Sequence, residues 1–147
     1  MNIGDKIMKK LMTPLILALV LTLTPTCLFA ANFVEIYNDD RDSIFVDTSS
    51  IQDKGTYYQV WTKWVLKGEA KKEASKRYKK EVDYFMDLSA YAKGAKQTCS
   101  LAMYFYDMNG QVIKSFNFEN YPISWTNVVP NSVGDVIIES IYIYMNN

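Results

Sequence analysis

The stretch Thr56-Tyr-Tyr-Gln-Val-Trp-Thr-Lys-Trp-Val-Leu-Lys67 is the longest strand-forming segment of the 147-residue chain, because it is rich in aromatic and β-branched residues. Successive side chains of a strand point to opposite faces, so this segment has two distinct faces. We assign the more apolar face to the core. It consists of alternate residues: Tyr58, Val60, Thr62, Trp64 and Leu66.

Shorter strand patterns precede and follow this segment. Residues 33–37 and 43–47 lie on either side of a polar cluster that is typical of a turn. Residues 97–106 and 111–118 flank an Asn-Gly pair, which readily adopts the left-handed conformations of a hairpin turn. Residues 78–91 fit both a helical and a strand period, and we favour a strand at the centre of this segment.

The last part of the chain has the pattern of an amphipathic helix. Ser132, with Asp135 three residues later, can cap a helix start, and the apolar residues that follow fall on one helical stripe. Asp135 and Glu139 would face away from this stripe. The many β-branched residues favour a strand instead, but we favour a helix because the cap and the stripe agree. The stripe consists of Val133, Val136, Ile137, Ile141 and Tyr144.

Residues 1–30 have the three-part pattern of a secretory signal peptide. Three lysines precede the almost uncharged apolar run of residues 11–23, and small residues follow that permit cleavage after Ala30. We therefore predict a signal peptide at residues 1–30 and a single domain at residues 31–147. About 117 residues are enough for one hydrophobic core, and the domain would be periplasmic, displayed on the cell surface or secreted.

Two other interpretations of this first segment are less favoured. A retained membrane anchor is disfavoured because Pro14 and Pro25 interrupt a stretch of marginal spanning length, and no basic cluster follows it. Lipidation of Cys27 is disfavoured because Thr-Pro-Thr precedes it, in place of the Leu-Ala-Gly type of sequence that precedes a lipid-modified cysteine. We therefore expect no membrane span after cleavage.

Composition excludes several classes of function. The 16 basic and 16 acidic residues cancel, and such a balance argues against nucleic acid as the main partner. Hydrophobic residues make up 49% of the chain, which argues against disorder. The sequence contains no histidine, phosphate-binding glycine loop, CxxC pair or zinc-ligand spacing. We therefore expect no enzyme activity, no catalytic residues, no cofactor and no metal site.

Residues 67–81 carry seven Lys or Arg against three Glu. They form either a basic patch or a solvated helix, in which Glu73 and Arg77 would pair. Aromatic and arginine side chains dominate protein-binding hot spots, so we combine this segment with two sheet aromatics into one candidate partner surface. The alternative for these two aromatics is an ordinary core position. The surface comprises Tyr57, Trp61, Lys71, Lys72, Lys76, Arg77, Lys79 and Lys80.

Cys99 would be the one cysteine that remains after cleavage of residues 1–30. It is either a reactive or intermolecular thiol, or a small apolar residue buried in a strand. We favour the second interpretation, because Cys99 opens an apolar run that ends at Tyr106 and the chain has no histidine to activate a thiol.

Short motifs spread over residues 32–145 resemble a known family. The most specific is Trp125-Thr-Asn-Val-Val-Pro-Asn-Ser-Val133, which is similar to a tryptophan followed by a Pro-x-Ser cap and a C-terminal helix. The others are Ser43-Ile-Phe-Val-Asp47 with Ser50-Ile51, Val60-Trp61, Tyr106-Asp107 with Gly110 and Val112, and Ser115. Together these features resemble the bacterial surface-adhesin protein E-like family.

The resemblance implies an α+β fold, an antiparallel β-sheet of about five or six strands with a C-terminal α-helix packed on one face. It also implies an exported adhesin that binds host extracellular-matrix and serum proteins, with a link to haem binding. Haem would have to rely on tyrosine or methionine here, because histidine is missing. Many relatives pair a cysteine near the C-terminal helix with one in a central strand, but residues 141–147 contain no cysteine.

We therefore expect an exported binding module without catalysis, whose partner is a protein. Host extracellular-matrix proteins are the partner class that the resemblance implies. Two alternatives stay open. The first is a housekeeping envelope protein with a structural or inhibitory role, and the second is a carrier that holds a small ligand between sheet and helix.

Overall fold

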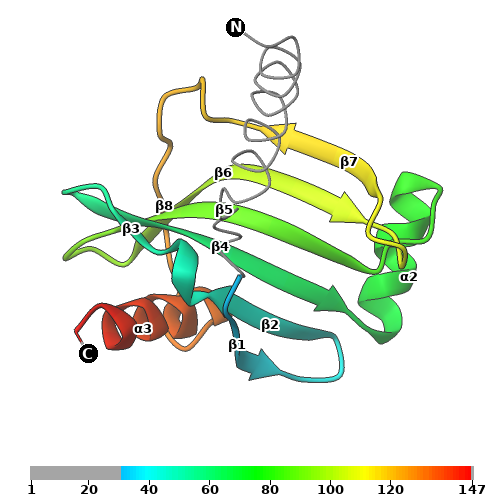
Figure 1. The fold of residues 1–147 in the computed structure, drawn as a ribbon, viewed down its shortest axis with the longest axis horizontal. Helices are drawn as coiled ribbons and strands as arrows, with labels where there is room; N and C mark the ends of the chain where they lie inside the picture. The colour runs from blue at the N-terminus through cyan, green and yellow to red at the C-terminus, as the bar shows by residue number, and fades with distance from the viewer. Residues whose placement is uncertain (1–30, 147) are drawn as a thin grey trace, which may run out of the picture.

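An antiparallel sheet is the centre of the structure, a computed structural model that describes residues 31–146 (Figure 1). The predicted signal peptide lies outside the described residues. The strand order is β1-β2-β4-β5-β6-β7, and two short strands, β3 and β8, pair with β4 and β6. The strands are β1 (Phe33–Asn38), β2 (Asp42–Asp47), β3 (Gln52–Asp53), β4 (Tyr57–Leu66), β5 (Tyr84–Ala92), β6 (Gln97–Tyr106), β7 (Val112–Asn117) and β8 (Thr126–Asn127).

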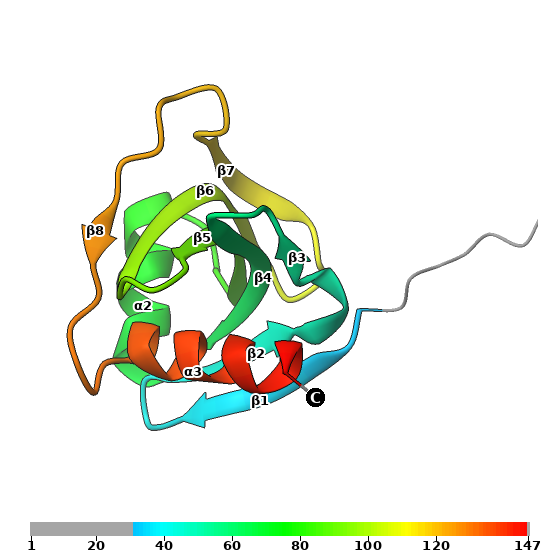
Figure 2. The ribbon, with the colours of Figure 1, turned by 90° about the vertical axis from the view of Figure 1, so that its left-hand side faces the viewer.

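Both α-helices lie on the same side of the sheet, and the edge strands β1 and β7 bend toward the other side (Figure 2). Helix α2 (Gly68–Tyr78) follows β4, and helix α3 (Val133–Met145) ends the described chain; a short 3-10 helix, η1 (Thr48–Ser50), follows β2. We call the two sides of the sheet the helix face and the open face. The expected antiparallel sheet with a C-terminal helix on one face is confirmed.

The predicted core face of β4 is the helix face. Val60 and Thr62 are fully buried there, and Val60 belongs to the same apolar cluster as Ile137 and Ile141 of α3. Toward the other end of the sheet, Tyr78 of α2 packs against a second cluster that contains Leu66. The alternation of side chains along β4 therefore predicts correctly which residues face the core.

The buried stripe of α3 differs from the predicted one. Ile137, Ile138 and Ile141 are buried, whereas Tyr144 is 41% exposed and Val136 is only half-buried. Tyr142, outside the predicted stripe, packs against the core cluster. The helix is thus turned relative to the expected orientation, although Glu139 is exposed as predicted.

Asp135 explains this rotation. It is buried rather than facing away, because its carboxylate accepts a hydrogen bond from Lys96 Nζ at 2.5 Å and another from the backbone N–H of Asn131 at 3.0 Å. These two bonds lower the pKa of Asp135. Ser132 is the N-cap residue, but its side chain makes no capping hydrogen bond. An ion pair to the β5–β6 turn, and not the predicted cap, orients the first turn of α3.

A buried carboxylate also lies in the middle of the sheet. Asp87 of β5 accepts hydrogen bonds from the hydroxyls of Ser89 and Ser100, both at 2.5 Å, and forms no ion pair within residues 31–146. Burial raises its pKa, and the two serine hydroxyls only partly oppose this effect. Burial together with the nearby charge of Asp87 also raises the pKa of Tyr91.

We predict that Ile137→Asp lowers the free energy of unfolding by about 3 kcal/mol or more, because it loses the burial of a branched side chain and places a charge in the core. Glu139→Ala, on the exposed side of α3, should cost less than about 0.5 kcal/mol. Urea melts of both variants at neutral pH provide the comparison. Equal midpoints would contradict the assigned buried face.

We also predict that Asp87 makes stability depend on pH. Its folded-state pKa lies above the unfolded value of 3.8, so its stabilising contribution is complete below pH 3.8 and is lost as the pH rises through the raised pKa. In Asp87→Asn this dependence disappears. Urea melts from pH 4 to 8 should show the variant gaining stability relative to the wild-type protein as the pH rises, and parallel profiles would refute this role of Asp87.

Candidate functional site

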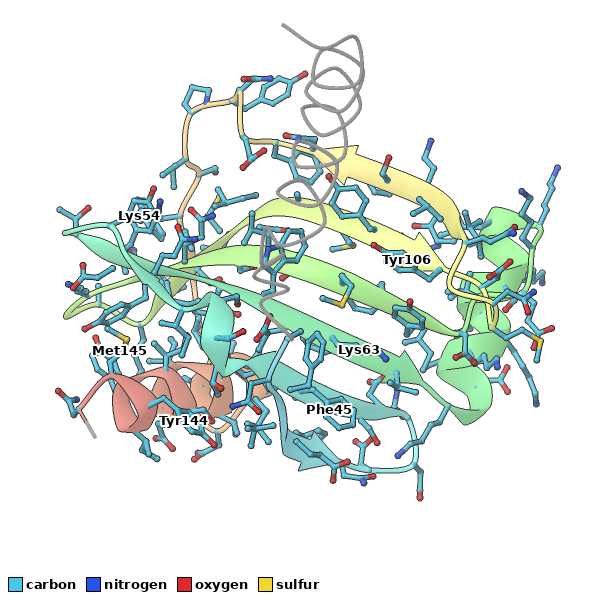
Figure 3. All side chains as sticks on the ribbon, viewed as in Figure 1. Phe45, Lys54, Lys63, Tyr106, Tyr144 and Met145 are labelled. Carbon is cyan, nitrogen blue, oxygen red and sulfur yellow. The ribbon has the colours of Figure 1, made fainter. Side chains whose placement is uncertain are left out.

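The open face of the sheet carries a groove of about 520 Å³. Its lining comes from strands β1, β2, β4, β5 and β6 and from the residues before β1. Figure 3 shows Lys63 and Tyr106 of this lining, with Phe45 of β2 on the same face. The lining residues are Ala31, Phe33, Asp47, Trp61, Lys63, Tyr84, Met86, Tyr104 and Tyr106.

Strand register assembles the floor of this groove. Lys63 pairs with Met86, and Met86 pairs in turn with Tyr104, so these three side chains form one row across β4, β5 and β6. Tyr84 and Tyr106 form the adjacent row, and their rings stack with centroids 4.7 Å apart. The floor is therefore built from side chains that are distant in sequence.

Trp61 extends the aromatic floor along β4. It is two residues from Lys63 and shares its face. The ring centroids of Trp61 and Tyr104 are 5.9 Å apart, and the ring planes are tilted by 48°. Both side chains are half-buried, so part of each aromatic surface is accessible from the groove.

Lys63 is the available charge of the groove. Its Nζ lies 4.3 Å from the centroid of the Tyr84 ring, and it forms no ion pair within residues 31–146. Asp47 also lines the groove, but this residue is only 8% exposed. Its Oδ1 atom accepts hydrogen bonds from the backbone N–H groups of Asn32 and Ser49 and from the Ser49 hydroxyl. The groove is thus aromatic with one unpaired cation.

Two tyrosines of the groove, Tyr84 and Tyr106, have a raised pKa and are neutral at physiological pH. Burial is the main cause that raises the pKa of Tyr84, and the nearby Tyr106 adds to it. Burial likewise raises the pKa of Tyr106, with a smaller effect from Tyr104. Their hydroxyl groups therefore remain hydrogen-bond donors beside apolar ring faces.

The structure divides the predicted partner surface between two sides of the sheet. Trp61 lines the groove, and Tyr57 lies on the same face. The rings of Tyr57 and Trp125 form an edge-type contact with their centroids 6.0 Å apart. The basic residues are on α2 or directly after it, and α2 packs on the helix face through Ala70, Ala74 and Tyr78. The two aromatics therefore lie on the open face, whereas the basic residues belong to α2 and the residues directly after it. The separated residues are Lys71, Lys72, Lys76, Arg77, Lys79 and Lys80.

The basic part is also partly neutralised. Lys71 forms ion pairs with Asp83 at 2.7 Å and Glu81 at 3.4 Å, and Lys72 pairs with Glu69 at 3.2 Å. The predicted Glu73–Arg77 pair is not among the ion pairs of the described residues. The four exposed cations without an ion pair in this part of the chain are Lys76, Arg77, Lys79 and Lys80.

Most of the groove was missed by reasoning from the sequence. The Tyr-x-Tyr spacing of Tyr104 and Tyr106 is a signal that both side chains share one face of a strand. Nothing in the local sequence shows that this face is the one that carries Lys63, because that depends on the register of β4, β5 and β6.

Cys99 lies in β6, as predicted, and packs against an apolar cluster that includes Leu88 and Leu101. It is half-buried rather than fully buried. It forms no disulfide within residues 31–146, so α3 is held to the sheet by apolar contacts and by the Lys96–Asp135 ion pair.

The family model of surface-adhesin protein E matches residues 33–141 of this chain, from the first residue of β1 to the last buried isoleucine of α3. The chain belongs to the surface-adhesin protein E family. Comparison with curated proteins and with solved structures gave no match. Membership of the adhesin family supports a surface adhesin-like role, an exported or surface location and a function other than catalysis.

Between residues 31 and 146, neither helix is both long and apolar enough to cross a membrane.

Proposed function

We propose that this member of the surface-adhesin protein E family is an exported, noncatalytic binding module that recognises a protein partner through the groove on the open face of its sheet. The observation that carries the proposal is the aromatic floor of Trp61, Tyr84, Tyr104 and Tyr106 around the unpaired Lys63. Tryptophan and tyrosine are enriched at protein interfaces, because each combines a large apolar surface with a polar group.

The position of the groove favours a macromolecular partner over a small carried ligand. In the carrier alternative the ligand would lie between sheet and helix, but Val60 and Val46 of the sheet pack there against Ile137 and Ile141 of α3. The groove lies on the opposite face and crosses five strands. Host extracellular-matrix proteins are the partner class that we propose, in line with the adhesin family.

Placement on a sheet is a further argument for binding. The floor residues belong to three central strands, each hydrogen-bonded to a strand on both sides. Side chains held on rigid elements lose less conformational freedom when a partner binds than side chains on loops. The groove is therefore prepared for recognition before a partner arrives.

We predict that Tyr104→Ala weakens binding to extracellular-matrix proteins by about tenfold or more, because it removes a central aromatic side chain of the interface. Tyr121→Ala, which removes a 69% exposed tyrosine outside the groove, is the matched control and should bind like the wild-type protein. Biolayer interferometry with immobilised matrix proteins measures the affinities of both variants. The protein is expressed from the full 147-residue sequence and purified after export.

The same assay separates the groove from the basic part of the predicted surface. A double variant, Lys76→Ala with Arg77→Ala, removes the two exposed cations of α2 that form no ion pair in the described residues and leaves the open face intact. Loss of binding in this variant, with full binding by Tyr104→Ala, would move the partner surface to α2 and refute the proposal.

Export itself is proposed from residues 1–30, which lie outside the described residues. We predict that the exported protein begins at or near Ala31, because the lysines and the apolar run direct the chain to the export machinery. Intact-mass analysis of protein from the periplasm, cell surface and medium checks the N-terminus. Recovery of the whole 147-residue chain in the membrane fraction would contradict cleavage.

A further inference from the structure

The groove repeats its contacts at the spacing of an extended chain. Trp61 and Lys63 are two residues apart on β4, and Tyr104 and Tyr106 are two residues apart on β6. Residues two apart in a strand are separated by about 6.5 Å. A ligand segment that is extended along these strands has the same repeat, so two of its side chains, separated by one residue, meet Trp61 and Lys63 together.

The charge of the groove indicates what one of these two ligand side chains is. Lys63 forms no ion pair in the described part of the chain, so it is not paired with Asp47, the acidic residue of the lining, whose Oδ1 atom accepts three hydrogen bonds from other groups. Glu35 lies in the same cross-strand row, but Phe45 separates it from Lys63. A carboxylate from a partner would therefore complete the site with a charge-assisted hydrogen bond.

The aromatic floor indicates the other side chain. The ring centroids of Trp61 and Tyr104 lie 5.9 Å apart, and both residues are half-buried, so a third ring can pack against the accessible part of this aromatic surface. Lys63 already lies over the Tyr84 ring at 4.3 Å, which holds its stem against the floor and keeps its ammonium beside the aromatic surface.

We infer that the groove recognises an extended acidic peptide segment in which a carboxylate side chain lies two residues from an aromatic side chain. This inference rests on the proposed function and adds the chemistry of the partner to it. The aromatic ring packs on Trp61 and Tyr104, and the carboxylate accepts a hydrogen bond from Lys63 Nζ.

Three capped peptides test this spacing and this charge, and the first two have identical composition. In the first, Asp and Phe are separated by one serine; in the second, Asp and Phe are adjacent; in a third, Lys replaces Asp in the spaced arrangement. We expect the spaced Asp peptide to bind about tenfold more tightly than the other two. Titrations of the exported protein, followed by NMR at the indole N–H of Trp61, measure the three dissociation constants and locate the contact.

Lys63→Met should reduce the preference for Asp over Lys in the peptide to nearly none, because it keeps an apolar stem and removes the charge. Lys54→Met is the matched control, because Lys54 is exposed, lies outside the groove lining and forms no ion pair in the described residues. Thermal melts confirm that both variants are folded. An unchanged preference in Lys63→Met would overturn the inference, because a merely structural lysine would leave the preference intact.

Other outcomes are equally decisive. Equal binding of the three peptides, or no binding of the spaced Asp peptide at about 1 mM, overturns the inference. A free aromatic carboxylate that binds as tightly as the peptide would overturn the assignment to a peptide. Binding to matrix proteins that depends on Tyr104 but is not competed by the spaced peptide would leave the proposed function standing and refute only this inference. If the protein prefers the spaced Asp peptide over the other two but does not bind matrix proteins, only the proposed partner class is refuted.

Discussion

The packing of α3 on one face of β4 is the contact on which the rest of the structure depends. β4 carries large apolar or aromatic side chains on both faces, but the helices cover only one of them. Val60 is fully buried beneath α3, while its neighbour Trp61 is half-buried on the open face. The groove is the direct consequence, because the uncovered face keeps an aromatic surface in contact with solvent. An apolar surface of this kind in an exported domain is best explained by a partner.

The residue types of the open face allow it to be exposed without a permanent cover. Tyrosine and tryptophan present a polar group at the end or edge of an apolar ring, and a lysine can cover a ring with its stem while its ammonium remains in water. Lys63 over Tyr84 is such an arrangement. Leucine or isoleucine at these positions would lack polar groups, and the surface would favour nonspecific association. These residue types therefore allow the open face to stay in contact with water in the free domain.

Patterns that are local in sequence could be predicted, and patterns that depend on distant contacts could not. The period of two along β4 identifies the core face, and the period of the final segment identifies α3. The predicted orientation of α3 was wrong, because the true orientation depends on the ion pair between Asp135 and Lys96, which is 39 residues away in the sequence. The groove was missed because Lys63, Met86 and Tyr104 meet only through the registers of two strand pairs. In the second pair a bulge at Leu88/Ser89 shifts the register, which no local pattern indicates.

The alternation of side chains along β4 links stability to recognition. Val60 and Thr62 are buried on the helix face of β4. The residues that alternate with them, Trp61 and Lys63, line the groove on the open face. The apolar contacts of α3 therefore also hold the positions of the groove side chains. Within residues 31–146 no disulfide joins α3 to the sheet, so these contacts and the Lys96–Asp135 ion pair hold the helix in place. A buried residue such as Ile137 therefore supports the geometry of the groove without lining it.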